Sequence, residues 1–445
     1  MSHPVNLAIV WAQYGPYHFA RMSALRKLAA DANLHAIEVA NQTSVYAWNR
    51  SRNATELVTL CPGCVFETLS FWKVFQRARR VFKELKLDVC ILPGYAPKQS
   101  FAVLAAAKSL GIRTVMMNES HAGTSRARAV GTLAKRRLMA LFDSALVGGG
   151  PQKRYAASLG FREEKIFIGY DAVDNDYFST RSEEIRARAP EIRAQYRLPE
   201  NYFLSLGRFV AKKNLATLIQ AYRMFLNVNP KSRTHLVMVG SGEEEDALRT
   251  LARELRLPVY QKTKAGGVAE LPALAPEPPG VHFYGFRQIE DNPVFYALAD
   301  AFVLPSLWEE WGLVVNEAMA SGLPVIVSET AGCAEDLLVT GRLAAPPQWS
   351  DKLRECLAQL AGRIRQNGFV FNPRSAQSLA NAFMLLECAP ELRRKMGQAS
   401  RRAIEKFSCD NFARNALAAV RMAARDSLPT NFAPKETPLG SKANP

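Results

Sequence analysis

A strand, a loop and a helix follow one another in residues 305–326, PSLWEEWGLVVNEAMASGLPVI. We expect the loop to carry Glu309 and the helix to begin near Gly312. The first amides of such a helix, those of Gly312, Leu313 and Val314, have no acceptor within the helix and lie at the positive end of its dipole. The segment therefore predicts an anion-binding position at the carboxyl end of a strand, where open α/β sheets bind their ligands.

Short apolar runs alternate with amphipathic helical patterns on both sides of this segment. In the first half we expect strands at 6–11, 34–39, 89–92, 114–117 and 145–147, and helices at 19–30, 71–85, 100–110 and 129–142. In the second half we expect strands at 202–206, 235–239, 281–284, 301–304 and 325–327, and helices at 215–226, 244–255, 292–299 and 313–321. This alternation is typical of βαβ units, so the sequence predicts an α/β fold with parallel sheets.

The chain has 445 residues, which suffices for two domains of about 200 residues each. A polar, charge-rich stretch without a strand pattern separates the two halves. We therefore divide the chain into a first domain at 1–174, a linker at 175–199, a second domain at 200–407, a C-terminal helix within 408–427 and a disordered tail at 428–445. The segments 258–280 and 339–367 interrupt the second-half pattern and are expected to be surface insertions.

The composition is that of a globular protein with excess positive charge. Hydrophobic residues make up 48% and charged residues 22%, which argues against disorder, collagen or a coiled coil. No apolar run reaches the roughly 20 residues of a membrane span, and no signal-peptide pattern opens the chain. Seven cysteines without disulfide spacing favour the cytoplasm. The net charge of +16 attracts polyanions, namely nucleic acid, anionic lipid or phosphorylated small molecules.

Two glutamates of the opening segment stand eight residues apart, Glu309 on the loop and Glu317 inside the helix. Carboxylate oxygens in such places can accept hydrogen bonds from the vicinal hydroxyls of a ribose or a hexose. For either glutamate alone, a capped helix with solvated carboxylates is the better interpretation.

A second motif lies at another strand-to-helix junction. Gly207 and Arg208 follow an expected strand, and Lys213 precedes the next helix. A guanidinium and an ammonium at one junction can clamp a diphosphate. By itself this pair would be read as a solvated loop. Together with the two glutamates at the end of another strand of the same sheet, it predicts a nucleotide-diphosphate-sugar site.

These motifs resemble those of the family-4 retaining glycosyltransferases, within glycosyltransferase group 1, over residues 202–407. The resemblance also rests on Val-Met-Val-Gly-Ser-Gly at 237–242 and Gly-Phe-Val-Phe-Asn-Pro at 368–373. It implies the GT-B architecture, with two Rossmann-like doubly wound domains facing a central cleft and a C-terminal helix crossing back to the first, acceptor-binding domain. It further implies transfer of a hexose-type sugar from a nucleotide-diphosphate donor to a glycan or lipid-linked acceptor, without a metal or cofactor.

The resemblance also implies roles for individual residues. Arg208 and Lys213 would hold the diphosphate and stabilise its departing charge. Glu317 would bind the ribose, and Glu309 the hydroxyls of the donor sugar or the charge at its anomeric carbon. The remaining expected donor contacts lie on a base-contacting loop and at the start of the helix after Glu309: Phe286, Arg287, Gly312, Leu313 and Val314.

The first half offers fewer candidates. In the family, a glycine-containing loop near the donor phosphates follows the first strand, which implies a donor contact at Gly15, with His18 close by. A polar side chain after the strand at 114–117 often faces the donor sugar. There we prefer His121 as a catalytic residue, with Glu119 next. A local hydrogen-bonding role for either histidine remains an equal alternative.

Three short motifs have a structural interpretation. The Asp-Asn-Asp sequence at 174–176 resembles a metal-binding pattern, but its place at the domain junction favours a turn. Cys61 and Cys64 supply only two of the four ligands of a zinc site. The three glycines at 148–150 lack the lysine and hydroxyl residue of a P-loop. We therefore expect no metal site.

Positive charge gathers in two expected helices of the first half, 71–85 and 126–142. Packing of the apolar stripe on a sheet, with solvated cations outside, explains each helix by itself. Both helices lie in the expected acceptor domain, however, and basic helices with aromatic residues also bind anionic membranes. A cytoplasmic protein that attaches peripherally to the inner membrane face is thus a second interpretation.

Two other function classes stay open. A GT-B sugar-nucleotide epimerase or hydrolase would turn over the donor without an acceptor. A non-enzymatic nucleic-acid or lipid-binding protein is suggested by the charge, but it leaves the paired motifs without a role. Because the sequence contains no known nucleic-acid-binding motif, we expect no nucleic-acid partner.

Overall fold

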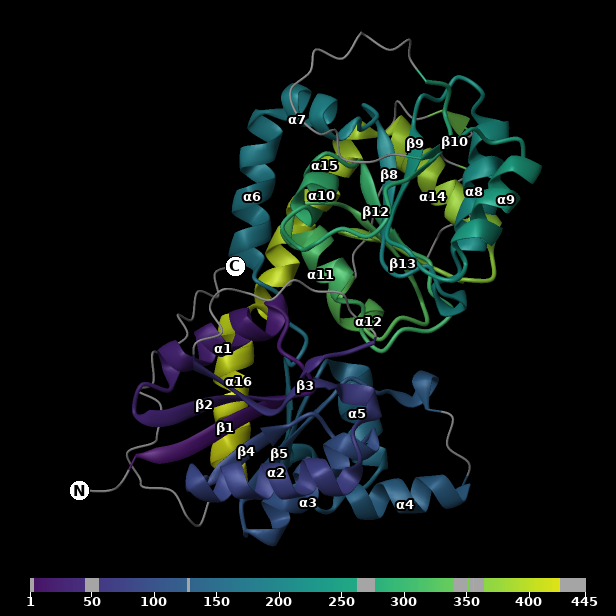
Figure 1. Cartoon of the computed structure of the whole chain (residues 1–445). Helices are drawn as coiled ribbons and strands as arrows, with labels where there is room; N and C mark the ends of the chain where they lie inside the picture. Colours follow the sequence, from purple (N-terminus) through teal and green to yellow (C-terminus); the bar gives the residue numbers. More distant parts are fainter. Residues whose placement is uncertain are drawn as a thin grey trace, which may run out of the picture.

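The computed structural model describes residues 4–44, 56–125, 129–261, 277–339, 350–351, 355 and 364–424. It consists of two α/β domains, each built around one mostly parallel sheet (Figure 1). The expected tail at 428–445, and most residues of the expected insertions at 258–280 and 339–367, lie outside the described residues.

The first domain contains a seven-stranded parallel sheet in the order β3-β2-β1-β4-β5-β6-β7. Its strands are β1 (Val5–Trp11), β2 (Ala32–Gln42), β3 (Leu57–Val65), β4 (Val89–Leu92), β5 (Arg113–Asn118), β6 (Ser144–Val147) and β7 (Ile166–Ile168). The order reverses between β1 and β4, so the loops after these strands border a crevice at the carboxyl edge. The five strands expected in this half are confirmed, whereas β3 and β7 were not expected.

Six helices cover the two faces of this sheet: α1 (Pro16–Leu28), α2 (Phe71–Glu84), α3 (Lys98–Ser109), α4 (Ala129–Met139), α5 (Gly150–Ser158) and α16 (Cys409–Ala423). Buried residues of α2 to α5 belong to the core on one face, and those of α1 and α16 to the core on the other. The pattern of α2 shows why: Val74, Ala78 and Phe82 recur every four residues and are all buried.

The second domain contains an eight-stranded sheet in the order β10-β11-β9-β8-β12-β13-β15-β14. Its strands are β8 (Tyr202–Leu206), β9 (His235–Val239), β10 (Val259–Gln261), β11 (Val281–Phe283), β12 (Ala301–Leu304), β13 (Val325–Ser328), β14 (Ile364–Arg365) and β15 (Gly368–Phe371). All neighbours are parallel except β14, which is antiparallel to β15. Here the order reverses between β8 and β12, which pair directly.

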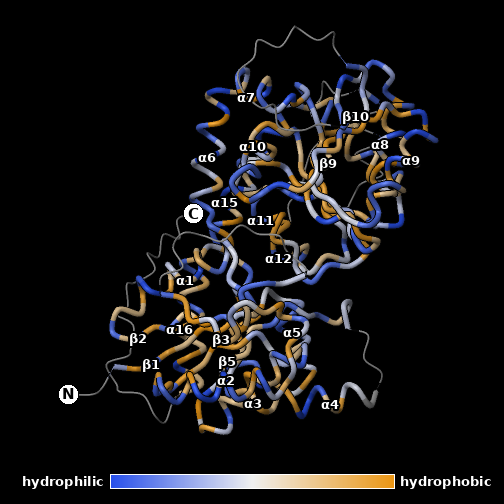
Figure 2. Tube along the Cα trace, in the orientation of Figure 1, coloured by the Kyte–Doolittle hydropathy of each residue, from blue (hydrophilic) through white to orange (hydrophobic). Residues whose placement is uncertain are grey.

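Helices again cover both faces of the second sheet. One core includes buried residues of α6 (Asn175–Ala187), α7 (Ala189–Tyr196), α10 (Asn292–Ala297), α11 (Leu313–Ala320) and α12 (Ala334–Leu337). The other includes residues of α8 (Leu215–Val228), α9 (Glu245–Glu254), α14 (Ala376–Cys388) and α15 (Pro390–Ile404). Figure 2 shows the hydrophobic residues concentrated along the strands and the inner sides of the helices. Within the described residues, no helix combines the length and apolar character that crossing a membrane requires.

The stretch at 175–199, expected as a linker, is mostly helical. It forms α6 and α7, and α6 packs against α10 and α11 of the second domain. Phe178, Ser182 and Ile185 of α6 are buried in this packing. Most of the stretch is therefore part of the second domain rather than a free connection.

The last described helix, α16, follows the second domain in sequence but packs in the first. It contacts α1, β6 and β7 (Figure 1). Phe412, Ala416 and Val420 are fully buried there, and the Ser144 hydroxyl donates a hydrogen bond of 2.7 Å to the carbonyl of Ala419. The chain thus crosses between the domains twice.

Candidate active site

The main cluster of charged side chains lies where the strand order of the second sheet reverses. Lys212 and Lys213 follow β8, and Glu309 and Glu310 follow β12. Because β8 and β12 are parallel neighbours, the loops after them meet at the same edge of the sheet. The structure therefore brings the expected residues Lys213 and Glu309 together.

Glu309 is held by both lysines. Lys213 Nζ forms an ion pair with one carboxylate oxygen, and Lys212 Nζ lies 3.2 Å from the other. Lys212 also pairs with Glu310 at 2.8 Å, and the Ser306 hydroxyl donates to Glu309 at 3.3 Å. The side chains of Lys213 and Glu309 are 14% and 10% exposed, so this pair is shielded from most of the solvent that weakens surface ion pairs.

Electrostatics keep Glu309 charged. Burial alone would raise the pKa of its carboxyl, but Lys213 and then Lys212 outweigh burial and hold that pKa below its ordinary value. The cluster consequently presents an ionised carboxylate and two ammonium groups at neutral pH. An incoming diphosphate would compete with Glu309 for these ammonium groups.

The first domain contacts this cluster through His121. The Gly123 amide donates to His121 Nδ1, which makes Nε2 the protonated nitrogen, and Nε2 donates to the Glu309 carbonyl at 2.9 Å. Gln152 Nε2 makes a similar bond of 2.8 Å to the Glu310 carbonyl. His121 thus reaches the loop of Glu309, but it binds the backbone of that loop and both of its ring nitrogens are engaged.

Gly312 begins α11 in a conformation that favours glycine. Its φ is 106°, and a Cβ at this position would lie 2.9 Å from Leu304 Cδ2 and 3.5 Å from Glu309 Cγ. This start of α11 places the amides of Leu313 and Val314, which have no acceptor within the helix, at the edge of the sheet that also carries the lysines. These are amides of the expected anion-binding position.

Glu317 differs from the expected open carboxylate. It is 0% exposed, and Tyr17 at the start of α1 in the first domain donates a hydrogen bond to its Oε1. Its Oε2 has no hydrogen-bond partner within the described residues, and neither do the nearby Tyr296 hydroxyl and Asn292 Oδ1. A proton on Oε2 would supply a donor that these acceptors lack.

Burial accordingly raises the pKa of Glu317 to about 7, although the hydrogen bond that Tyr17 donates acts to lower this pKa. Because the folded protein binds this proton more tightly than the unfolded chain, the stability from Glu317 is lost as the pH rises from about 4.5 to 7. We expect E317Q to remove this loss, about 2–3 kcal/mol at roughly 1.4 kcal/mol per pKa unit. Chemical unfolding at pH 4.5 and 7.5 measures the free energy of unfolding of both proteins. An equal change of this free energy with pH in E317Q and in the wild type would contradict the raised pKa.

The other expected donor contacts lie on three loops, of which only the loop of Arg208 also carries the lysines. Arg208 is exposed on the loop after β8, and Phe286, 41% exposed, and Arg287 follow β11, two strands away from β8. Gly15 precedes α1 in the first domain, where its amide donates to His18 Nδ1. Burial, followed by the charge of Arg21, lowers the pKa of His18 to about 3, so this histidine is a neutral, local hydrogen-bonding residue.

Three side chains of this region were not selected from the sequence. Lys212 had a signal, since it adjoins Lys213, but only the folded loop shows that both lysines face Glu309. Tyr17 lies between two residues that were considered, Gly15 and His18, but its contact with the other domain leaves no local pattern in the sequence. Gln152 also had no signal in the sequence that could have identified it.

A buried acid pair lies beside the contact between the domains. Burial raises the pKa of Asp171, and Glu119 adds to this effect through its charge. The pKa of Glu119 is raised as well, first by burial, although Arg21 opposes it. Glu119 thus interacts electrostatically with Asp171 and also with Glu310 and Glu309.

The three short motifs that were given a structural interpretation form hydrogen bonds within the protein. The Asp174 carboxylate caps α6 by accepting from the Tyr177 amide at 2.9 Å. The amide of Gly150 donates to Asp336 of the second domain at 2.9 Å, and Cys64 accepts from Lys73 at 3.4 Å. Among the described residues, no group of three or more His, Cys, Asp or Glu side chains is arranged to hold a metal.

Known proteins resemble this chain in sequence and in fold. Residues 200–387 match the family model described as "Glycosyl transferases group 1". The solved structures that resemble the chain include a glycosyltransferase from Rickettsia africae (TM-score 0.66, 14% identity, 96% of this chain and 100% of that one). Another is sucrose-phosphate synthase from Thermosynechococcus elongatus (TM-score 0.64, 16% identity, 94% and 98%). The chain thus has the GT-B fold.

Among curated relatives, mannosylfructose-phosphate synthase of Agrobacterium fabrum is 30% identical over 37% of this chain and 32% of its own length. O-antigen chain mannosyltransferase B of Escherichia coli is 31% identical over 33% of each chain. The matched part therefore spans about a third of these relatives. The family model and the named relatives therefore show similarity to group 1 glycosyltransferases over less than half of this chain.

Proposed function

We propose that this protein is a retaining glycosyltransferase of the family-4 type, which moves a hexose-type sugar from a nucleotide diphosphate to a glycan or lipid-linked acceptor. The observation that carries the proposal is the Lys213–Glu309 pair at the point where the second sheet reverses its strand order. Cationic and carboxylate groups at this place suit a ligand that has both a diphosphate and a polyhydroxylated ring.

Each group then has a role. Lys213 and Lys212 bind the diphosphate together with the amides of Leu313 and Val314, and Arg208 approaches from the same loop. The bond between the anomeric carbon and the diphosphate oxygen breaks, and these donors stabilise the charge that develops on that oxygen. The acceptor hydroxyl forms the new bond on the same face of the sugar and passes its proton to the leaving phosphate. Glu309 accepts hydrogen bonds from the sugar hydroxyls.

Similar proteins support the nature of the donor. Anabaena HepE, solved in complex with UDP and glucose, has a TM-score of 0.62 and 16% identity over 94% of this chain and 99% of its own. The curated relatives include a mannosyltransferase. We assign a nucleotide sugar as the donor class and leave open the choice between UDP and GDP.

The proposal includes a metal-independent reaction in the cytoplasm. The lysines supply the positive charge that a metal ion supplies to the diphosphate in other transferases. The described cysteines are all free thiols, which suits a reducing compartment.

Incubation of the protein with a panel of UDP- and GDP-sugars, with and without EDTA, tests this function. We expect slow release of the nucleotide from one donor, unchanged by EDTA, and retention of the anomeric configuration in the transferred sugar. Release that stops with EDTA would contradict the metal-independent reaction. Tight binding of duplex DNA without binding of any nucleotide would contradict the whole proposal, whereas epimerised donor as the product would identify an epimerase.

A further inference from the structure

The outer side of α2 carries an unusual row of side chains. Trp72, Arg79 and Lys83 lie on the helix, and Lys86 lies just past its end; we call these four residues the α2 ridge. All four are exposed, and Trp72 is 67% exposed, which is high for an indole. We propose that the α2 ridge docks this protein on an anionic lipid bilayer.

Helix geometry places the ridge on one line. Trp72 and Arg79 are seven residues apart, and Lys83 is four further, so they share a face of the helix. Val74, Ala78 and Phe82 bury another face of the helix in the core of the first domain, and α2 packs along α3. The ridge is therefore part of the surface of α2 that the fold leaves open.

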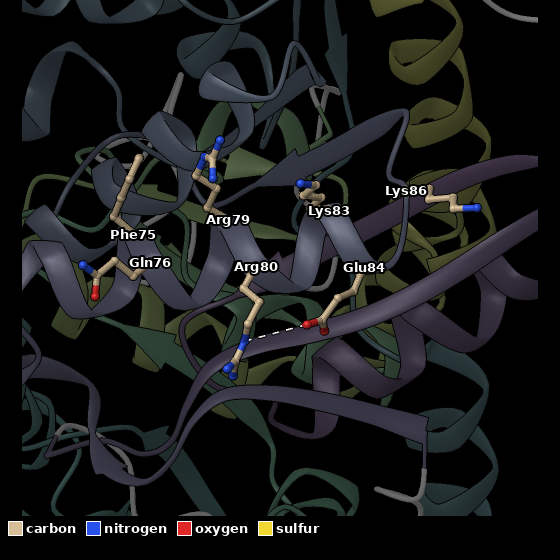
Figure 3. Close-up of a pocket in the computed structure, with 7 residues that line it drawn as sticks. All are labelled: Phe75, Gln76, Arg79, Arg80, Lys83, Glu84 and Lys86. Atoms are coloured by element: carbon tan, nitrogen blue, oxygen red, sulfur yellow. Dashed lines mark ion pairs between the residues drawn. The ribbon is translucent and has the colours of Figure 1, made fainter.

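The cations of the ridge are available to an external partner. The side chains of Arg79, Lys83 and Lys86 form no ion pair or hydrogen bond with any part of the chain that the structure describes. The single acid of the helix, Glu84, pairs with Arg80 at 3.8 Å. In Figure 3 this pair points to one side of α2, and Arg79 and Lys83 point to the other.

A hollow of about 690 Å³ lies along the same helix. The described residues that line it are Phe75, Gln76, Arg79, Arg80, Lys83, Glu84 and Lys86. Basic side chains with an aromatic floor give a lipid phosphate both a charge partner and an apolar contact for the glycerol region.

The combination of a cationic row with an exposed indole selects a membrane among the polyanions. Tryptophan prefers the headgroup level of a bilayer, where its ring is apolar and its N–H is hydrated. The second basic helix, α4, has fewer cations available to an external partner. Lys135 donates hydrogen bonds to Ser125 and Tyr155, and Arg136 donates one to the Ser158 carbonyl. The docking contact is therefore assigned to α2.

The orientation of α2 connects the ridge with the cleft. α2 follows β3 and runs back along the sheet, so its first turn, with Trp72, lies toward the carboxyl edge of the first sheet. The loop that carries Tyr17 leaves the sheet at the same edge, after β1. Docking along the ridge would bring that edge close to the bilayer surface. Access of a lipid-linked acceptor to this edge rests on the proposed function, but the docking itself does not.

Co-sedimentation of the full chain with vesicles tests the proposal. The wild type should bind vesicles with 30% phosphatidylserine or phosphatidylglycerol, should lose binding as salt rises, and should not bind phosphatidylcholine alone. The variant R79E/K83E/K86E should bind about 100-fold more weakly, because each basic residue at an anionic surface adds several-fold to the affinity. W72S should weaken binding less, and should make the residual binding more sensitive to salt.

A matched control changes the same charge elsewhere. K231E/R233E/R256E alters three exposed cations of the second domain and should bind vesicles as the wild type does. Equal losses in both triple variants, or no binding of the wild type to anionic vesicles, would overturn the proposal. One further outcome would overturn the proposal. In it, the wild type binds a free nucleic-acid duplex tightly, R79E/K83E/K86E is the only variant that loses this binding, and R79E/K83E/K86E still binds vesicles. Donor release measured without lipid should be the same in all variants, which keeps this test separate from that of the transfer reaction.

Discussion

K213M should release nucleotide from its donor about 100- to 1000-fold more slowly than the wild type, the loss typical when one preorganised group that stabilises transition-state charge is removed. Lys213 is the more enclosed of the two lysines at Glu309, with 14% of its side chain exposed against 20% for Lys212. Its positive charge therefore acts on the departing diphosphate with less screening by water. Initial rates of donor release at saturating donor measure the effect.

K212M is the matched control, because it removes the same charge one residue earlier. We expect a loss of about tenfold, or about 1.4 kcal/mol, since Lys212 also pairs with Glu310 and Lys213 remains at Glu309. Both variants should unfold cooperatively. A K213M enzyme as fast as the wild type, or a greater loss in K212M, would place the chemistry elsewhere.

F412A should lower the stability of the first domain by about 3–5 kcal/mol, the usual cost of removing a fully buried phenylalanine side chain. The Phe412 ring is 0% exposed and packs near the ring of Tyr170, with the Arg21 guanidinium 5.8 Å from its centre. For a domain of this size the loss corresponds to a fall in Tm of roughly 6–20 °C. Thermal unfolding followed by circular dichroism gives the value.

R414A serves as the control on the same helix. Arg414 is exposed and bonds only locally, to Asn411, so its removal should change stability by about 0.5 kcal/mol or less. If F412A and R414A melt at the same temperature, α16 does not hold the first domain together. Nucleotide binding by the second domain should survive in both.

Much of the fold could be predicted because the strands are continuous apolar runs. Strands such as β4, β8 and β12 were found with their bounds since both of their faces are covered by helices. β3 was not predicted because Pro62 and Gly63 interrupt its apolar run and are typical of a turn. α6 was not predicted because many charged residues surround the few side chains that it buries.

The site was predictable only in part. Lys213 and Glu309 each follow a recognisable strand, and a doubly wound sheet brings such loops together. The bond of Tyr17 to Glu317 depends instead on how two domains meet, and neither loop shows that in its own sequence. The same holds for His121, whose partner is a backbone carbonyl with no side-chain signature.

The return of α16 has a consequence for biosynthesis. Residues 409–423 leave the ribosome after the whole second domain, yet they complete one face of the first sheet. Until then the part of this face that α16 covers, over β4, β5, β6 and β7, stays exposed, although domains in general fold in the order of their synthesis. The nascent chain therefore exposes apolar surface of the first sheet until residues 409–423 have been synthesised, and this surface favours aggregation during that time.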